Sequence, residues 1–391
     1  MKYNFDKVID RSGTSAEKVE GLKHIWGRTD LIPLWVADMD FATAPFVTDA
    51  IRKRCENEVL GYTGKPDSYY NAIINWVKQR YDLIVTKEVI NFVPGIVPGI
   101  GMAMNCFTQK GDKVMIQPPV YHPFAWVTTR NERTLVINPL KWENGMYRMD
   151  LDAFREQIKG CKLFILCNPH NPGGVVWTEA ELRAIADICY DEKVLVFSDE
   201  IHADLTLPPH THRPFATVCE KARMNSVTFM SPSKAFNMPG LSASHALIFN
   251  EDLRKRFRIY MDAGELDMGH VFAFLSVEAA YSHGTEWLDQ CLAYIQGNID
   301  FVDEFLKKHA PKIKAIRPEA SYLVWLDCRE LELSQKDLNE FFVDKAHLAL
   351  NDGEMVGKEG IGFMRLNVAS PRCIIEKAMK QLADAYQLYI K

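Results

Sequence analysis

The chain has 391 residues, which at about 150 residues per domain is enough for two or three domains with large cores and a cleft between them. Hydrophobic residues make up 47% and charged residues 25% of the sequence, which excludes a wholly disordered chain and a collagen-like or coiled-coil rod. The 46 basic and 51 acidic residues give a formal net charge of −5, so we expect a small-molecule partner, with no nucleic acid and no membrane surface.

The N-terminal part of the chain differs in pattern from the middle. Met1–Glu20 contains several charged residues and lacks the continuous apolar segment of a signal peptide. Nine scattered cysteines, without a C-x-x-C pair, predict free thiols in a reducing compartment. We therefore expect a cytoplasmic protein, whose residues 1–45, with Pro33 and Pro45, form an arm reaching the smaller domain or another subunit.

The uncharged segment Val89–Gln109 is interrupted by glycine, proline and asparagine, so it is unsuited to cross a membrane, which needs mostly apolar residues throughout. We interpret it as a buried loop and helix. Its sequence GIVPGIG, Gly95–Gly101, precedes a helical run to Phe107. The amides of this motif predict a helix N-terminus that binds an anion.

The middle of the chain alternates short apolar strands with amphipathic helices. In Glu179–Tyr190, apolar residues recur at spacings of three and four after an N-cap at Thr178. Strands and helices in alternation predict an α/β fold with a mostly parallel sheet and helices on both faces. Six segments are predicted as strands buried on both faces: Lys113–Ile116, Thr134–Ile137, Lys162–Cys167, Val194–Ser198, Val227–Met230 and Ala246–Phe249.

After about residue 283 the pattern changes to a long helix, Glu286–Lys308, then short strands near Tyr322–Asp327 and Phe363–Asn367, and a closing helix from Arg372. This pattern predicts a second, smaller α+β domain. We divide the chain into an N-terminal arm that includes part of the small domain (1–45), a large domain (46–283) and a C-terminal small domain (284–391).

The loops that follow the predicted strands carry the polar residues, and ligands of open parallel sheets lie outside the carboxyl ends of the strands. NPHNPGG, Asn168–Gly174, forms a rigid turn that presents the amide of Asn171. Asp199 stands at the mouth of an apolar strand, and SPSK, Ser231–Lys234, places two hydroxyls and an amine within four residues.

These groups together describe a pocket for pyridoxal phosphate. The glycine-rich helix start with Ser231 and Ser233 suits the phosphate, the Lys234 amine suits a Schiff base, and the Asp199 carboxylate suits the pyridine nitrogen. The acid matters because a protonated ring accepts the electrons left when a bond at the amino-acid α-carbon breaks.

The sequence resembles the fold-type I pyridoxal phosphate enzymes of the aminotransferase class I and II group, and within them the MalY/PatB branch of cystathionine β-lyases. The resemblance covers essentially the whole chain and implies a large domain with a mostly parallel seven-stranded sheet, a smaller α+β domain and a homodimer with shared sites. Eight motifs in this order carry it: WVADMDF at Trp35–Phe41, GYTGKPDSYYNAI at Gly61–Ile73, PGIVPGI at Pro94–Ile100, PPVYHPF at Pro118–Phe124, NPHNPGG, SDEIHADL at Ser198–Leu205, SPSKAFNMPGL at Ser231–Leu241 and MRLNVASPR at Met364–Arg372.

For the cofactor ring, the resemblance implies that Lys234 is the Schiff-base lysine and Asp199 the partner of the pyridine nitrogen. It implies Asn171 as the donor to the 3-oxygen of the ring and as a substrate contact, Tyr121 as the aromatic side chain stacked on the ring, and His202 as a further cofactor contact.

For the phosphate, the resemblance implies Ile96, Val97, Ser231 and Ser233, with Tyr62 reaching the phosphate of the neighbouring subunit.

For the substrate, the resemblance implies that Arg365 binds the α-carboxylate, for which its planar pair of donors is suited.

One position departs from the aminotransferase pattern. Aminotransferases of the group commonly carry a phosphate-binding arginine eight residues after the lysine, where this chain has Ser242. The departure favours the lyase branch.

Other interpretations exist for the same residues. Ser231-x-x-Lys234 matches the first motif of penicillin-binding acyl enzymes, but the supporting S-D-N and K-T-G motifs are absent from the sequence. No G-x-G-x-x-G follows the first strand of an alternating unit, which disfavours a nicotinamide dehydrogenase. A zinc or manganese site is disfavoured by the positions of its candidate ligands, and we expect no metal: Asp199, Glu200, His202, Asp204, His210 and His212.

Each site residue also has a purely structural interpretation: Lys234 as a solvated lysine, Asp199 as a cap, Asn171 as an Asx turn, Tyr121 as a core aromatic and Arg365 as part of a salt bridge.

The sequence hypothesis is β-elimination on a sulfur-bearing L-amino acid, giving a thiol, pyruvate and ammonia. Lys234 would remove the α-proton, and Tyr121 or Lys234 would deliver a proton to sulfur. The alternatives are an aminotransferase and, less favoured, an additional regulatory binding role.

Overall fold

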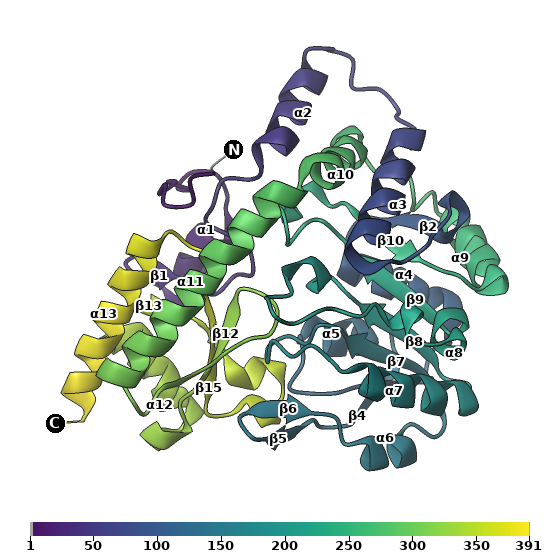
Figure 1. Cartoon of the computed structure of the whole chain (residues 1–391). Helices are drawn as coiled ribbons and strands as arrows, with labels where there is room; N and C mark the ends of the chain where they lie inside the picture. Colours follow the sequence, from purple (N-terminus) through teal and green to yellow (C-terminus); the bar gives the residue numbers. More distant parts are fainter. Residues whose placement is uncertain (1–2, 391) are drawn as a thin grey trace.

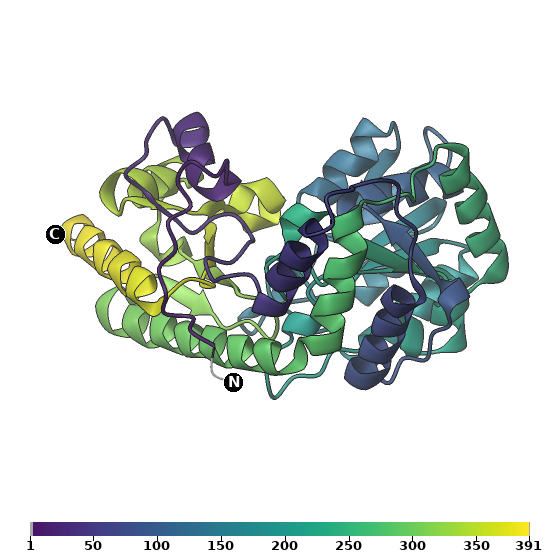
Figure 2. The same ribbon diagram turned by 90° about the horizontal axis from the view of Figure 1, so that it is seen from above.

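The computed structural model describes residues 3–390, which form two lobes side by side, with a long helix, α11 (Thr285–His309), leading from one lobe into the other (Figure 1, Figure 2). Each lobe is built on its own sheet with helices packed against it. None of the helices within residues 3–390 has the length and apolar character needed to span a membrane.

The larger sheet has seven strands. Four of the six neighbouring pairs are parallel, and β10 is antiparallel to both of its neighbours, which confirms the mostly parallel seven-stranded sheet. Across the sheet the strands are β2 (Ile90–Val93), β10 (Ser244–Leu247), β9 (Ser226–Met230), β8 (Leu195–Asp199), β7 (Cys161–Cys167), β3 (Lys113–Ile116) and β4 (Thr134–Ile137).

Helices cover both faces of this sheet. One face packs against α4 (Ile96–Phe107), α5 (Pro123–Arg130) and α9 (Glu251–Ala263). The other face packs against α6 (Leu151–Gln157), α7 (Glu179–Asp191), α8 (Glu220–Met224), α3 (Asp67–Tyr81) and α10 (Val271–His283), with α2 (Pro45–Cys55) against α10. The predicted N-cap of α7 is confirmed, because Thr178 and Glu181 form a reciprocal capping box.

Three details of the sequence prediction were wrong. β4 is not buried on both faces: Thr134 is exposed and Ile137 keeps 40% of its surface, because β4 is the edge strand with a neighbour on one side only. Ile90–Val93, expected as a loop, is a strand. The helix begins at Ile96, directly after Gly95, so GIVPGIG forms the first turns of α4 and does not precede it.

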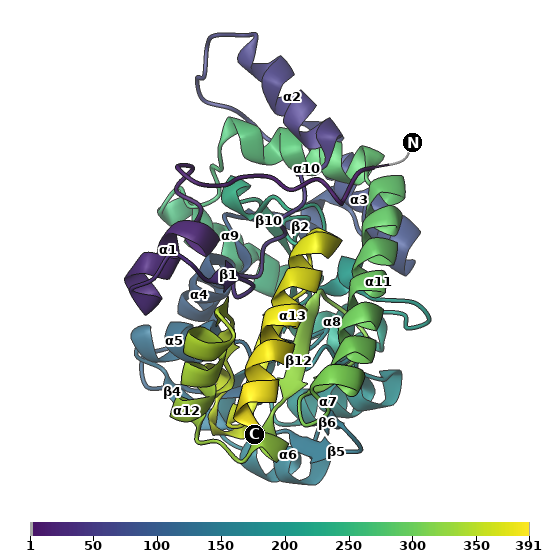
Figure 3. The same cartoon turned by 90° about the vertical axis from the view of Figure 1, so that its left-hand side faces the viewer.

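The smaller lobe contains a four-stranded antiparallel sheet in the order β11 (Lys314–Ile316), β12 (Leu323–Asp327), β15 (Phe363–Asn367) and β14 (Asn351–Asp352). Helices α11, α12 (Gln335–Glu340) and α13 (Arg372–Tyr389) accompany it, and α11 and α13 run side by side (Figure 3). A separate hairpin, β5 (Lys141–Glu143) and β6 (Met146–Arg148), belongs to the large-lobe segment of the chain.

The N-terminal segment joins the smaller lobe. After α1 (Glu17–Trp26), strand β1 (Ile32–Pro33) pairs in parallel with β13 (Leu348–Ala349). The chain then passes between the lobes, where the Asn367 side chain donates to the carbonyls of Val36 and Asp38 at 2.7 Å each. These contacts fix the segment Trp35–Asp40 beside the carboxyl ends of the large sheet.

Candidate active site

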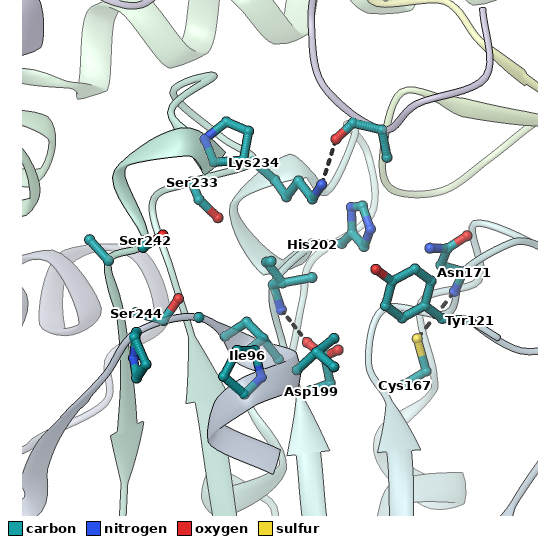
Figure 4. A pocket seen from close by; sticks show the side chains of 18 residues that line it. Ile96, Tyr121, Cys167, Asn171, Asp199, His202, Ser233, Lys234, Ser242 and Ser244 are labelled. Atoms are coloured by element: carbon teal, nitrogen blue, oxygen red, sulfur yellow. Dashed lines mark hydrogen bonds between the residues drawn. The ribbon is translucent and has the colours of Figure 1, made fainter. Parts of the chain in front are cut away.

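A pocket of about 210 Å³ opens at the carboxyl ends of β7, β8 and β9 (Figure 4). This volume equals roughly seven waters at about 30 Å³ each, enough for one small molecule. The residues predicted from separate loops meet here: Ile96, Val97, Tyr121, Asn171, Asp199, His202, Ser233 and Lys234 all line the pocket, with Ala37, Cys167, Ser242 and Ser244 among the others.

Asp199, the last residue of β8, is 4% exposed. Burial raises the pKa of its carboxyl group to about 7, and the charge of Glu200 adds to that effect, while the amide of Ile201 at 3.1 Å and the amine of Lys234 oppose it. A carboxylate held so unfavourably requires a cationic partner to ionise fully at neutral pH.

Lys234 follows the end of β9, and its side chain is mostly buried. Its amine donates to the carbonyl of Ala37 at 2.5 Å, and the Tyr322 hydroxyl donates to the same oxygen at 2.9 Å. Burial lowers the pKa of the Lys234 amine to about 8, with Arg365 acting in the same direction and Asp38 and Asp199 opposing it. Near physiological pH this amine is therefore still mostly protonated, but it loses its proton far more readily than an exposed lysine does.

A helix N-terminus and hydroxyl groups form another wall of the pocket. α4 begins at Ile96 without a side-chain cap, so the positive end of the helix faces the pocket beside Ser233, Ser242 and Ser244 (Figure 4). Ser231 does not line the pocket: its hydroxyl donates to the carbonyl of Ala243 at 2.8 Å and accepts from the amide of Ser233 at 3.1 Å. Ser231 therefore holds the turn that carries Ser233.

Arg365 comes from the other lobe, in the middle of β15. It is 5% exposed, and its hydrogen-bond partners are neutral oxygens: Oδ1 of Asn171 at 3.2 Å, the carbonyl of Trp35 at 3.2 Å, and Oδ1 of Asn351. Burial lowers the pKa of Arg365 to about 10. A buried cation with neutral partners favours the arrival of an anion.

Tyr121 and Asn171 are held together by the backbone, since the amide of Tyr121 donates to the carbonyl of Asn171 at 3.1 Å. His202 is 3% exposed, and burial together with the charges of Lys234 and Arg365 lowers its pKa to about 3, so its ring is neutral. Its Nδ1 has no hydrogen-bond partner within residues 3–390. These side chains add polar atoms but no net charge to the pocket.

Tyr62 lies apart from the pocket. It is 98% exposed, on the segment between α2 and α3 that projects from the molecule in Figure 1. The predicted pocket residues of the large lobe other than Ser231 thus line one pocket within this chain, and Tyr62 does not join them.

Sequence reasoning missed three groups of this site. Ala37 takes part through its backbone carbonyl, so its side chain gives no signal, although it lies in the quoted motif WVADMDF. Tyr322 begins a predicted strand and resembles a core aromatic residue. Asn351 lies in a two-residue strand, too short for its pairing with Arg365 to be read from periodicity.

The residues of the alternative interpretations have other partners. Glu200 accepts from Ser198, from the amide of Phe215 and from His212, each at 2.8 Å. Asp204 accepts from Trp76 and Tyr81. The Ser231 hydroxyl of the S-x-x-K pattern donates to the Ala243 carbonyl. Glu200, Asp204, His212 and Ser231 thus have hydrogen-bond partners within the protein.

Comparisons with known proteins agree with this geometry. The sequence profile of the family described as aminotransferase class I and II matches residues 29–382. The chain is 38% identical over 384 residues to the cystathionine beta-lyase PatB of Bacillus subtilis (strain 168), covering 98% of this chain and 99% of that protein.

Two solved structures extend the similarity to three dimensions. The PLP-bound putative aminotransferase of Clostridium difficile 630 has a TM-score of 0.96 and 40% identity, covering 98% of this chain and all of that one. The PLP-bound C-S lyase of Staphylococcus hominis has a TM-score of 0.91 and 35% identity, covering 98% of both chains. The resemblance noted in the sequence is confirmed: the chain belongs to the aminotransferase class I and II family of pyridoxal-phosphate-dependent enzymes, of the MalY/PatB type.

Proposed function

We propose that this protein is a carbon–sulfur β-lyase, which cleaves a sulfur-containing L-amino acid such as cystathionine into a thiol, pyruvate and ammonia. One observation carries the proposal: a buried amine with a pKa near 8, Lys234, lines the same pocket as a buried acid, Asp199, next to a buried arginine that has only neutral partners. The named relatives, PatB and the C-S lyase, support the type of reaction.

The pocket fits pyridoxal phosphate. The open N-terminus of α4 with Ser233 suits the dianionic phosphate, and the buried Asp199 suits a pyridinium nitrogen, which would supply the cation that this carboxylate requires. Tyr121 and Asn171 line the same pocket, and we assign Tyr121 to cover a ring face and Asn171 to donate to a ring oxygen. Ile96, Val97 and His202, which line the pocket, complete the proposed cofactor contacts. Ser231 acts indirectly, by holding the turn that carries Ser233.

When bound, the cofactor supplies an electron sink for the bond that breaks at the α-carbon. Lys234 acts as the base that removes the α-proton, because burial brings its pKa close to working pH, where a general base is most effective. The carbonyl of Ala37 takes one N–H of the amine and so restrains the direction of its lone pair. Tyr121 or Lys234 then delivers a proton to the leaving sulfur.

Arg365 binds and orients the substrate α-carboxylate. Its guanidinium is held by Asn351, Trp35 and Asn171, and its hydrogen-bond partners within residues 3–390 are all neutral oxygens. A fixed carboxylate fixes the direction of the bond to be broken, and such orientation contributes a large share of rate enhancement. Asn171 also contacts the substrate, since it already lies against Arg365.

The second candidate function is an aminotransferase, which the C. difficile structure of that description favours. Ser242 lines the pocket at the position where aminotransferases of the group commonly have an arginine, and this favours the lyase. The test is incubation of the pure holoenzyme with cystathionine and no keto acid. Sustained pyruvate release supports the lyase, and a single stoichiometric turnover contradicts it.

The protein further acts as a homodimer with shared sites. The support is the projecting segment around Tyr62, where Val59 and Leu60 are also exposed. Tyr62 would reach the phosphate in the pocket of the second copy. A molar mass of one chain in solution, measured by light scattering on the active enzyme, would contradict this proposal.

We also assign the protein to the cytoplasm, where its nine cysteines, all free thiols in the described chain, remain reduced.

The division into an arm, a large domain and a small domain at residues 45 and 283 stays a proposal, and limited proteolysis near these positions tests it.

A further inference from the structure

A cluster of four charged side chains from the N-terminal part of the chain lies next to the backbone carbonyl that contacts Lys234. Two are cations, Arg11 and Lys18, and two are carboxylates, Asp38 and Asp40. Arg11 lies 2.6 Å from Asp38 and 3.1 Å from Asp40. Lys18 lies 2.8 Å from Asp40 and 3.6 Å from Asp38. Each cation thus contacts both carboxylates, and the formal charges of the cluster cancel. We call it the N-terminal charge cluster.

Lys18 is the most deeply buried member of the cluster. Its side chain, on helix α1, has no exposed surface, and a fully buried lysine is rare unless it is paired. Its carbonyl accepts from the indole N–H of Trp35 at 2.9 Å, which ties α1 to the segment between the lobes. Replacing a buried ion pair by apolar residues of similar volume is often neutral or stabilising. Anchoring alone would therefore not require a charge at this position.

Asp38 joins the cluster to the active site. It directly follows Ala37, whose carbonyl accepts from the Lys234 amine at 2.5 Å. The carbonyl of Asp38 itself accepts from Asn367 at 2.7 Å and from Lys18 at 3.4 Å, so the backbone that presents the Ala37 carbonyl is fixed from the next residue. The negative charge of Asp38 raises the pKa of the Lys234 amine, against the larger lowering by burial. An anion near an amine favours its protonated form.

The other ionisable groups around this amine belong to elements outside the cluster: Tyr121, Asp199, His202, Tyr322 and Arg365. Arg365 lowers and Asp199 raises the pKa of the Lys234 amine. The ring of His202 is neutral, since burial lowers its pKa to about 3, and burial raises the pKa values of both tyrosines, which stay neutral. Variants of the cluster leave all five side chains in place, so a change at the amine reports the charge of the cluster.

We infer that Lys18 is a positioning residue for the Lys234 amine, acting through Asp38. Together with Arg11 it balances the negative charge of Asp38 and fixes the segment that carries the Ala37 carbonyl. The cluster thereby limits how strongly this segment keeps a proton on the amine that binds the cofactor. The inference rests on the proposed role of Lys234 and adds to it a group that lies outside the pocket lining.

The experiment follows the visible absorbance of the bound cofactor in the holoenzyme against pH, because this absorbance changes when the nitrogen that joins the cofactor to Lys234 gains or loses a proton. In Lys18→Met the cluster has one excess negative charge, so we expect the midpoint to rise by about 0.5 to 1 pH unit. In Asp38→Asn it has one excess positive charge, and the midpoint should fall by about 1 unit. The double variant restores the balance, and its midpoint should return close to the original.

Lys23→Met is the matched control, because Lys23 is an exposed lysine on the same helix, and its midpoint should stay in place. A cluster that only anchors the segment would move the midpoint in the same direction in both single variants. That result, or no shift in either, overturns the inference. If Lys18→Met does not fold, Arg11→Gln decides, since the Arg11 side chain is 24% exposed. A smaller upward shift supports the inference, and a downward or absent shift overturns it.

The same measurement separates this inference from the proposed function. The midpoint is recorded without substrate, so a holoenzyme that releases no pyruvate contradicts the lyase function while the shifts still decide the role of Lys18. If Lys234→Ala keeps the visible absorbance of the bound cofactor, Lys234 is not the cofactor lysine, and both its proposed role and this inference are wrong. Unchanged midpoints beside a colourless Lys234→Ala overturn the inference alone.

Discussion

The two lobes contribute different kinds of groups to the active site. In the large lobe, Asp199 ends β8 and Lys234 follows the end of the neighbouring strand β9. Burial moves the pKa of the acid up to about 7 and that of the amine down to about 8. In the small lobe, Arg365 lies inside an antiparallel strand among neutral oxygens. The large lobe is thus suited to hold the cofactor and move protons, and the small lobe to recognise substrate charge.

The N-terminal segment connects these two contributions. The carbonyl of Trp35 accepts from Arg365, and the carbonyl of Ala37 accepts from Lys234. Two backbone carbonyls of one short segment, two residues apart, therefore contact the key side chain of each lobe. Variants of each lobe and of this connection test whether the roles are separate.

The largest effect is expected for Lys234→Ala. Without the amine, the base is lost, and activity should fall by about 10³-fold or more, together with the visible absorbance of the bound cofactor. The assay is pyruvate release and the absorbance spectrum of the purified protein. Lys308→Ala, at an exposed position of α11, is the control. Activity above a tenth of the original would remove Lys234 from the reaction.

The second variant is Asp199→Asn, for which we expect a loss of activity of about 10²- to 10³-fold but a gain in stability of the cofactor-free protein. The folded pKa of about 7 lies above the unfolded value of 3.8, so the unaltered protein loses stability as the pH rises from about 4 to about 7, and this loss persists above pH 7.

The asparagine variant lacks this penalty. Its melting temperature should exceed that of the unaltered protein by several degrees at pH 8, on the order expected for a few kcal/mol, and by much less at pH 4.5. Thermal unfolding of both cofactor-free proteins at the two pH values is the measurement. A melting temperature lower than that of the unaltered protein at pH 8 would mean that Asp199 has a stabilising partner that burial alone does not reveal.

The third variant tests the small lobe. Arg365→Gln removes the charged donors, so we expect the KM for the amino-acid substrate to rise about 100-fold or more, since each charged hydrogen bond contributes about 1.5–3 kcal/mol. The cofactor spectrum should stay unchanged, because cofactor contacts belong to the other lobe. Arg317→Gln, half-exposed beside Asp300, serves as the control. Loss of the cofactor from the Arg365 variant would contradict the separation of roles.

The smallest effect is expected for Tyr322→Phe, which tests the connecting segment. With the hydroxyl gone, the Ala37 carbonyl accepts from Lys234 alone and holds the protonated amine more tightly, so the pKa of Lys234 should rise from about 8. Uptake of pyridoxal phosphate by the cofactor-free protein, followed against pH, should shift to higher pH, with a two- to tenfold decrease in rate at pH 7.5. Tyr190→Phe, at the surface, should leave this profile in place, and a downward shift in the Tyr322 variant would refute the argument.

The sequence was most informative where the signal is local. Lys113–Ile116, Phe363–Asn367 and the start of the last helix at Arg372 were predicted with the bounds that the structure has, because alternation and helical spacing depend on neighbouring residues only. The edge position of β4 was missed, since whether a strand has one neighbour or two is decided by residues far along the chain.

The same division applies to the site. The residues at strand ends, Asn171, Asp199 and Lys234, could be found in the sequence because parallel strands deliver their carboxyl ends to one edge. The neutral surroundings of Arg365 and the carbonyl of Ala37 that holds Lys234 arise only from tertiary structure. A contact made by a backbone carbonyl leaves no trace in the residue type. The pKa of an ionisable side chain shifts with its burial, and burial is decided only when the two lobes pack together.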